Sequence, residues 1–523
     1  MSSSSTPSTP ASKPAVKGGT ISIFGLALLN ITAVVALNNL PAEAEYGLSS
    51  VFYYVIAAVF YLVPIALVAA ELATGWPEKG GVFRWVGEAF KGRIGFMVMF
   101  IAWIEVCVFI PTALTFGAVS LAFIDPDEKQ ALDIAGNEWF VIAIVLVVYA
   151  IATLITFLGS KGFATMAKWG GVIGVFIPMG VLFIGGIAYA IGGNKPQMDV
   201  SWGSLVPDFA GFGTVVLALG ITQMFAGMEM NAVHVKEVKN PTRNYPIAIF
   251  ISAALTVLIF VIGTLAIAWV VPAKDINLTQ AILVTYYDIF EWMGIPWGGS
   301  VAAIMLAVGV LVTVTTWVAG PSTGLLAGAK TGYLPPAWQK TNKHGAPVLI
   351  LLVQAGIIVI LAILFVVLPS VQAAYQILEQ LATILYITIY LLMFSAVIRL
   401  RYSQPDRPRP FRLGKKGNTL LWIVAGCGLL VSGFTFFVEF VPPSQIQVGS
   451  PVLYTVLLIV AVLVVYAIPN VIYQFRKPSW KSNDPDYAPF TWEVPAEAAA
   501  AGEKIRPAST PTTGTTSPES KES

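Results

Sequence analysis

The chain is poor in charge, histidine and cysteine. Of its 523 residues, 11 % are Asp, Glu, Lys or Arg, less than half of the roughly 25 % found in soluble globular proteins. This shortage excludes a soluble multi-domain enzyme, and it excludes disorder except at the ends. The two cysteines, Cys107 and Cys427, lie in apolar stretches and form neither a disulfide framework nor a metal cluster. The two histidines, His234 and His344, are too few for a buried haem pair, so we expect no cofactor and no metal.

Apolar residues are correspondingly abundant. They make up 56 % of the chain, and the mean hydropathy is +0.77. About 20 apolar residues suffice to cross the lipid core as a helix. The chain is therefore expected to be an all-α integral membrane protein in contact with the lipid bilayer. The apolar runs predict twelve spans, at residues 20–41, 49–73, 94–124, 138–159, 164–192, 211–235, 245–271, 297–329, 347–368, 371–398, 418–440 and 451–474.

The two ends differ in composition from the part between them. Residues 1–17 are rich in Ser, Thr and Pro, and no cleavable secretory signal is recognisable there. Residues 476–523 are again polar and rich in Pro, Ala and Thr. Such segments bury too little apolar surface to order themselves. We therefore expect a disordered N-terminus at 1–17, a twelve-helix domain at 18–475 and a mostly disordered tail at 476–523.

The distribution of basic residues predicts the orientation. An even number of spans places both ends on one side, and only Lys129, Lys195 and Lys274 of the 30 basic residues fall on the other. Because basic loops stay in the cytoplasm, both termini are expected there, with the chain in the inner (plasma) membrane. The basic cluster at 399–416 is interpreted as a cytoplasmic anchor; a lipid-binding or nucleic-acid patch is the alternative. We expect no nucleic-acid partner, and the oligomeric state stays open.

Six acidic residues fall within the predicted spans, with Glu138 at the first residue of span 4, and one basic residue, Lys168, lies near the start of span 5. Glu71 and Glu439 are near span ends and are expected to reach the interface, whereas Glu105, Glu229 and Glu379 are deeper. A carboxylate at membrane depth must be protonated, face water or meet a cation from outside the protein. The alternative for each is a protonated side chain bonded to a neighbouring helix. Glu105, Glu229 and Glu379 are therefore candidates for proton coupling.

Two spans carry helix-breaking residues. In span 6, Gly227 is followed by polar Glu229 and Asn231, and glycine weakens a helix by roughly 1 kcal/mol relative to alanine. In span 1, Pro41 lacks the N–H that would bond to Leu37 one turn earlier. Interrupted spans in corresponding positions of two halves indicate the binding site of a secondary transporter. Their free N–H groups suit a carboxylate and their free carbonyls suit an ammonium group, so an amino acid satisfies both.

Three sequence strings are typical of one superfamily. They are EKGGVFRW at 78–85, EVKNPTRNYP at 237–246 and WVAGPS at 317–322. With these strings the chain resembles the amino acid–polyamine–organocation transporters, and it is most similar to their glutamate:GABA antiporters, over residues 18–475. The resemblance implies a LeuT-like 5+5 inverted repeat, with discontinuous helices 1 and 6 and two extra helices. It also implies exchange of an amino acid for another, or for its decarboxylated product, by alternating access.

The resemblance also assigns residues. Glu229 matches the acid after the span 6 break, Tyr386 and Tyr390 match two pathway tyrosines, and Trp317 matches a pathway tryptophan; a packing role is the alternative for the three aromatics. Glu237 and Arg243 match a structural or gating motif. The substrate-binding residues implied are Val34, Val35, Ala36, Asn38, Ala226, Gly227, Glu229, Trp317, Tyr386 and Tyr390.

Departures from the pattern keep a second function open. Thr313 stands where the glutamate:GABA exchangers carry an acid, Asn38 where they carry an aromatic, and Val34 to Ala36 where many relatives have glycines. Glu105 and Glu379 look like additions. More acid around the pathway suits a proton-coupled permease for cationic amino acids or polyamines. The glutamate:GABA exchangers carry a folded C-terminal segment that plugs the cytoplasmic mouth of the transporter. In this chain only the stretch near residues 482–495 has apolar residues that suit such a plug.

Other function classes find little support. A membrane-embedded enzyme needs paired catalytic groups at membrane depth, and only single, separated glutamates are present. A pore normally carries repeated polar segments from several subunits, and none is evident. The phosphate-binding string of a primary pump is missing as well. We therefore expect a secondary transporter and not an enzyme.

Overall fold

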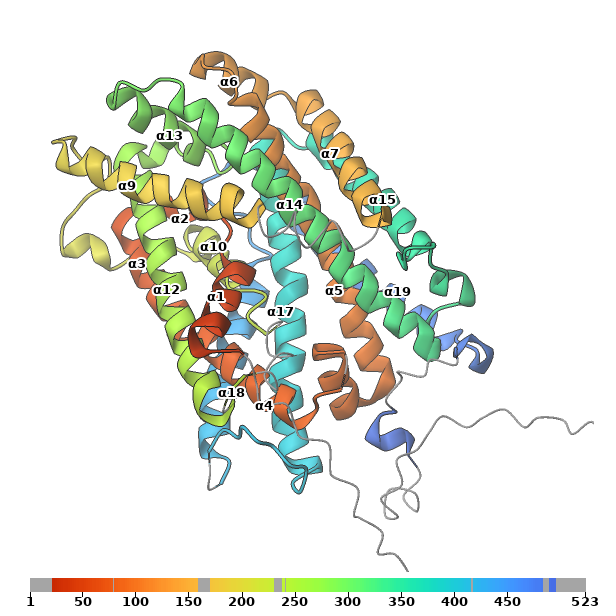
Figure 1. Cartoon of the computed structure of the whole chain (residues 1–523). Coiled ribbons are helices and arrows are strands. Elements are labelled where there is room, and N and C mark those ends of the chain that lie inside the picture. The colour runs from red at the N-terminus through yellow and green to blue at the C-terminus, as the bar shows by residue number, and fades with distance from the viewer. Residues whose placement is uncertain are drawn as a thin grey trace, which may run out of the picture.

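The computed structural model describes residues 21–78, 80–158, 170–229, 238–239, 241–414, 417–482 and 489–494, and in these the fold is all-helical (Figure 1). Within these ranges the only β-pairings are two isolated bridges. The helices are α1 (Ile23–Val34), α2 (Leu40–Ala44), α3 (Ser50–Ala57), α4 (Val63–Gly75), α5 (Val82–Ala122), α6 (Glu128–Ala135), α7 (Glu138–Leu158), α9 (Ile177–Ile191), α10 (Val216–Leu219), α11 (Ile221–Met224), α12 (Pro241–Val270), α13 (Ala281–Trp292), α14 (Gly298–Gly328), α15 (Val348–Ala362), α16 (Leu364–Val367), α17 (Val371–Ser403), α18 (Thr419–Val438) and α19 (Pro451–Gln474).

Ten helical segments in the described ranges are long and apolar enough to cross a membrane. Each overlaps one of the predicted spans 2–5 and 7–12. The predicted spans 1 and 6 instead contain short helices, α1 with α2 and α10 with α11, and non-helical residues interrupt both spans. The multi-helix membrane architecture is therefore confirmed. The count of twelve spans and the inverted repeat remain predictions.

Two long helices, α5 and α17, form the centre of the bundle. Their most apolar stretches are 78 % and 72 % buried, against 22 % for α19 at the periphery. In Figure 1, α17 runs through the middle of the molecule, and it packs along α5. Peripheral helices expose apolar side chains, which is the arrangement expected of a surface that faces lipid. Most polar residues on α17 are therefore enclosed by protein.

A buried ion pair joins α4 to the end of α17. Arg401 donates to both carboxylate oxygens of Glu71, at 2.6 and 2.5 Å from one nitrogen, and both side chains are buried. Arg409 approaches the same carboxylate at 3.5 Å, and the Leu413 N–H donates to it. The expectation that Glu71 reaches the interface is therefore wrong. The sequence predicts the end of this span at 398, but α17 continues to Ser403 and brings Arg401 into the interior.

Part of the C-terminal tail packs on the start of α5. Phe490 is 1 % exposed, and its ring stacks on Trp492. The Trp492 indole donates to the Gly87 carbonyl, and the Thr491 N–H donates to Glu88. The Arg84 guanidinium lies over the Phe490 ring. Residues 489–494 are thus held against α5 by contacts. They belong to the stretch near 482–495 whose apolar residues suit the family's plug. Residues 483–488 and 495–523 lie outside the described residues.

Candidate functional site

The first interruption lies between α1 and α2. Helix α1 ends at Val34, and Val35 is extended (ψ 114°). Helix α2 starts at Leu40, with Pro41 in its first turn, where its missing N–H leaves no bond unmade. The sequence therefore locates this break correctly, and the Leu37 carbonyl accepts the Leu40 N–H instead of a bond from Pro41. Around the break Val34, Val35 and Asn38 are buried, and Ala36 is half-buried.

The second interruption follows α11. The chain turns after Met224, and Gly227 has φ 95°, a conformation that residues other than glycine rarely adopt. Ala226 and Glu229 are buried beside it. The predicted break at Gly227 is confirmed.

Glu229 connects this break to α17. The Tyr386 hydroxyl donates to Glu229 Oε1 at 2.8 Å, and the Tyr390 hydroxyl donates to Oε2 at 2.6 Å. The Tyr390 oxygen also accepts the Gly227 N–H at 3.2 Å. The two tyrosines are four residues apart, so they lie on one face of α17. The structure therefore brings together Gly227, Glu229, Tyr386 and Tyr390, four of the residues that the resemblance assigns to the binding site.

The other two deep acids bond to the interruptions from different helices. On α5, Glu105 is buried and accepts a bond from Gln223 Nε2 at 3.0 Å, and Gln223 lies on α11 just before the second break. On α17, Glu379 Oε1 accepts a bond from Asn39 Nδ2 at 2.7 Å, and Asn39 belongs to the first break. Each acid therefore contacts a segment whose helix is broken.

A small cavity lies beside the first break. It measures about 20 Å³, and its polar lining comes from Asn38, Asn39, Glu43, Tyr375, Gln376 and Glu379. We call it the inner cavity. Neither Glu43 nor Gln376 is among the predicted site residues. The predicted span 1 ends at residue 41, but the helix restarts at Leu40 and carries Glu43 into the protein interior. Glu43 could have been found from its spacing: it is an acidic residue four positions after Asn39, one helical turn beyond the break.

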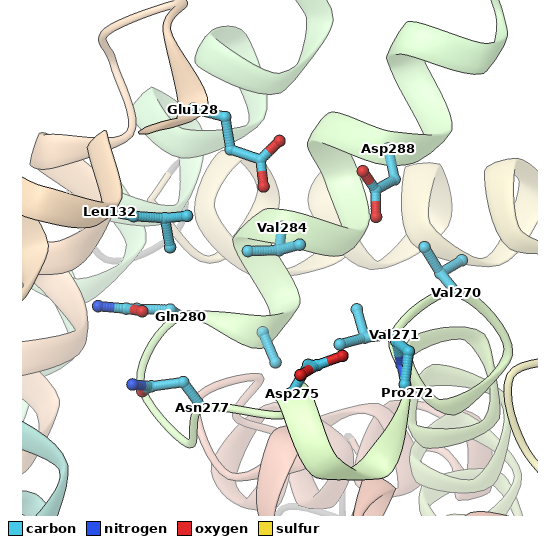
Figure 2. Close-up of a pocket in the computed structure, with 11 residues that line it drawn as sticks. Glu128, Leu132, Val270, Val271, Pro272, Asp275, Asn277, Gln280, Val284 and Asp288 are labelled. Atoms are coloured by element: carbon cyan, nitrogen blue, oxygen red, sulfur yellow. The ribbon is translucent and has the colours of Figure 1, made fainter. Parts of the chain in front are cut away.

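A larger pocket lies between α6 and α13, and neither interruption lines it. It measures about 250 Å³ and includes Glu128, Asp275 and Asp288 (Figure 2). In Figure 2 the carboxylates of Glu128 and Asp288 point toward the same space beside Val284. Burial, with added repulsion from Glu128 and Glu291, raises the pKa of Asp288 to about 6. Because no broken helix contributes to this pocket, we assign the candidate substrate site to the interruptions instead.

The remaining predicted residues lie elsewhere. Trp317 on α14 packs edge-on against Phe109 of α5, with ring centroids 5.9 Å apart. Arg243 is exposed at the start of α12. Glu237 lies outside the described residues. The expectation that Glu439 reaches the interface is wrong, because this residue is buried at the end of α18, and its Oε1 has no hydrogen-bond partner in the described part of the chain.

Comparison with known sequences identifies the family. The family model for amino acid permeases matches residues 21–462. The chain belongs to this family. It is 36 % identical over 451 residues to an uncharacterized transporter of Legionella pneumophila, covering 86 % of this chain and 95 % of that protein. It is 32 % identical over 464 residues to a glutamate/gamma-aminobutyrate antiporter of Lactococcus lactis, covering 87 % and 90 %.

A more distant relative is named for a different substrate. A probable agmatine/putrescine antiporter of Lactococcus lactis is 23 % identical over 405 residues, covering 75 % of this chain and 82 % of the relative. The permease is therefore a multi-pass membrane transporter of the amino acid–polyamine–organocation superfamily and not an enzyme. Its family indicates a small amino acid or amine as substrate.

Proposed function

We propose that this permease is an antiporter that exchanges an amino acid for an amine, of the glutamate:GABA type, by alternating access. The observation that supports the proposal best is the connection from the second helix break to α17 through Glu229, Tyr386 and Tyr390. A carboxylate bound by two hydroxyls at a broken helix is a contact that a rearrangement of either element would open or close. The relatives named as glutamate/gamma-aminobutyrate antiporters match most of the chain, which also supports the proposal.

In this proposal the substrate lies between the two interruptions. Backbone N–H groups at the interruptions face its carboxylate, and backbone carbonyls there face its ammonium group. The contacts come from the residues assigned by resemblance, from Val34 to Asn38, from Ala226 to Glu229, and from Trp317, Tyr386 and Tyr390. Glu237 and Arg243 serve as structural or gating residues.

The proposal includes the orientation and the domain division. Both ends lie in the cytoplasm and the protein in the inner membrane, since almost all basic residues fall on the side of the termini. Residues 18–475 form the transporter domain, flanked by the segments 1–17 and 476–523. In this orientation the pocket between α6 and α13 lies on the outer side.

A specific observation favours a second candidate, a proton-coupled permease for cationic amino acids or polyamines. Glu379 lines the inner cavity, and Glu105 bonds to the helix that precedes the second break. Acids so placed suit a cation. The two candidates differ in coupling, because an exchanger needs substrate on both sides of the membrane and a proton-coupled permease needs only a proton gradient.

Transport into proteoliposomes tests the proposal. Radiolabelled glutamate, GABA, arginine and putrescine are offered, at acidic and at neutral pH, to vesicles that are empty or preloaded with each compound. We expect labelled glutamate or GABA to enter preloaded vesicles only. Uptake of arginine or putrescine into empty vesicles, driven by a proton gradient, would contradict antiport and support the permease.

A further inference from the structure

The inner cavity contains acceptor atoms without partners in the described part of the protein. Glu43 is 0 % exposed, and neither of its carboxylate oxygens has a hydrogen-bond partner there. Glu379 uses Oε1 to accept the Asn39 amide, but its Oε2 is buried without a partner. A buried acceptor without a partner is rare in proteins and costs free energy, more so when it is charged. The two carboxylates therefore indicate a ligand that donates hydrogen bonds.

A neutral side chain supports the same conclusion. Gln376, one turn before Gln380 on α17, lines the cavity and is 5 % exposed, and among the described residues its amide forms no hydrogen bond. Asn39 differs, because its oxygen accepts the Tyr375 hydroxyl at 2.8 Å and its nitrogen donates to Glu379. In the cavity, hydrogen bonds therefore run from the Tyr375 hydroxyl to Asn39 and from Asn39 to Glu379. Beside them lie acceptor oxygens that accept no hydrogen bond, on Glu43, Gln376 and Glu379.

The charge of the ligand follows from the lining. The described residues around the cavity include two carboxylates and no Lys, Arg or His. An ionised carboxylate removed from water needs a cation close by. Because this lining supplies none, each carboxyl is either protonated or meets a cation that comes with the ligand.

The size of the cavity limits the shape of that cation. About 20 Å³ is room for a single water-sized group, since one water needs roughly 10–15 Å³ by the same measure. A primary ammonium group has this size and carries three N–H donors. Those three donors match the unused acceptors of Glu43, Gln376 and Glu379. A guanidinium or a methylated amine is too large for the space.

We propose that the inner cavity is a binding site for the primary ammonium group of the transported amine, held by Glu43, Glu379 and Gln376. The proposal rests on the proposed amino acid/amine exchange and specifies its amine partner as a substrate with an unmethylated, cationic end. Gly220, at the joint between α10 and α11, lies close to Glu43, whose Oε1 is 3.8 Å from the position that a Cβ on this glycine would take. Binding at Glu43 therefore occurs beside the segment that leads to the second break, which links the amine to the interrupted part of the site.

Binding of putrescine to the purified full-length protein tests this site without relying on transport. The readout is the rise in the thermal unfolding midpoint with ligand concentration, which gives an apparent Kd. The matched ligand is N,N,N′,N′-tetramethylputrescine, which keeps the chain length and both charges but adds methyl groups to each end. The matched variant is Glu45→Gln, because Glu45 follows two residues after Glu43 and does not line the cavity.

We expect putrescine to stabilise the wild type and the methylated analogue not to do so. Glu43→Gln and Glu379→Gln should each raise the apparent Kd for putrescine at least tenfold, and Glu45→Gln should leave it within twofold. Wild-type affinity in Glu43→Gln would overturn the proposal. Equal stabilisation by the methylated analogue would also overturn the proposal. Stabilisation by NaCl that Glu43→Gln and Glu379→Gln abolish would overturn it as well, because the site would then bind an inorganic cation.

Failure of the proposed function would look different. If the wild-type protein exchanges neither glutamate nor GABA but still binds putrescine through Glu43, the antiport is wrong and the ammonium site stands. If exchange is intact and putrescine binding ignores Glu43 and Glu379, the ammonium site is wrong and the antiport stands. Should Glu43→Gln fail to fold, Gln376→Leu provides the second test, since it removes a neutral acceptor of the cavity without changing its charge; unchanged putrescine affinity in this variant would overturn the proposal.

Discussion

Replacing Glu229 by glutamine probes the contact between the second break and α17. In the wild type each carboxylate oxygen accepts one tyrosine hydroxyl, at 2.8 Å from Tyr386 and 2.6 Å from Tyr390. Glutamine is nearly the same size, but its amide nitrogen cannot accept a hydrogen bond. One of the two bonds is therefore lost, and the other no longer involves a charge.

The structure gives the size of the expected effect. A hydrogen bond to a charged group contributes roughly 1.5–3 kcal/mol. Losing one such bond changes an equilibrium between connected and separated states by about 10- to 150-fold, at 1.4 kcal/mol per factor of ten. We therefore expect Glu229→Gln to lower the initial exchange rate at least tenfold. Since the change is nearly isosteric, the protein should keep its thermal unfolding midpoint within a few degrees.

Radiolabel exchange in proteoliposomes, normalised to the amount of reconstituted protein, measures this effect. Tyr386→Phe and Tyr390→Phe are the matched variants, because each removes one hydroxyl and keeps the carboxylate; both should lower the rate less than Glu229→Gln does. Wild-type exchange by a well-folded Glu229→Gln protein would refute the reasoning. An inactive Glu229→Gln protein with fully active tyrosine variants would show that the carboxylate acts without the hydroxyls.

Three further changes test other parts of the structure. Arg401→Met removes the side chain that donates to both oxygens of the buried Glu71 carboxylate, so we expect a loss of about 3 kcal/mol in unfolding free energy, measured by denaturation in detergent. Arg401→Met combined with Glu71→Leu should recover most of this loss, and no recovery would contradict the pairing. Phe490→Ala removes the buried anchor of the tail, so limited proteolysis should cut after residue 482 faster, while an unchanged cutting rate would show that other contacts hold the segment. Asp288 has a raised pKa of about 6 in the folded protein, above the ordinary 3.8, so its neutral form contributes stability that is full below about pH 3.8 and is lost as the pH rises through about 6. Asp288→Asn should therefore melt increasingly higher than the wild type between about pH 4 and pH 7, and a constant difference across this range would contradict the raised pKa.

The sequence predicts the membrane helices well because each one is a long apolar run, and such runs have few alternative structures in lipid. It also predicts both interruptions, because Pro41 and Gly227 act on the backbone locally. Helix ends are less certain: α17 extends past the predicted end at 398, and this extension places Arg401 beside Glu71. Partners of that kind come from distant parts of the chain, which local composition does not reveal.

The candidate site is predictable in part for the same reason. Spacing and resemblance both point to Glu229, Tyr386 and Tyr390. Composition does not predict Glu43 as a buried residue, because the apolar run ends before it. Glu43 is buried in the protein because the helix restarts at Leu40. The unused acceptors of the inner cavity can be recognised only when several helices are placed together, since each residue alone is an ordinary polar side chain.

The most direct test of the account asks whether substrate covers both interruptions. Ala36→Cys and Ala226→Cys are introduced separately, with Cys107 and Cys427 replaced by alanine, and the rate of labelling by a small thiol reagent is measured in membranes. Ser201→Cys serves as the control, because Ser201 is exposed and belongs to neither interruption. We expect saturating substrate to slow labelling at both interruptions and to leave the control unchanged. If saturating substrate leaves the labelling rate unchanged at both interruptions, the two broken helices do not form the binding site.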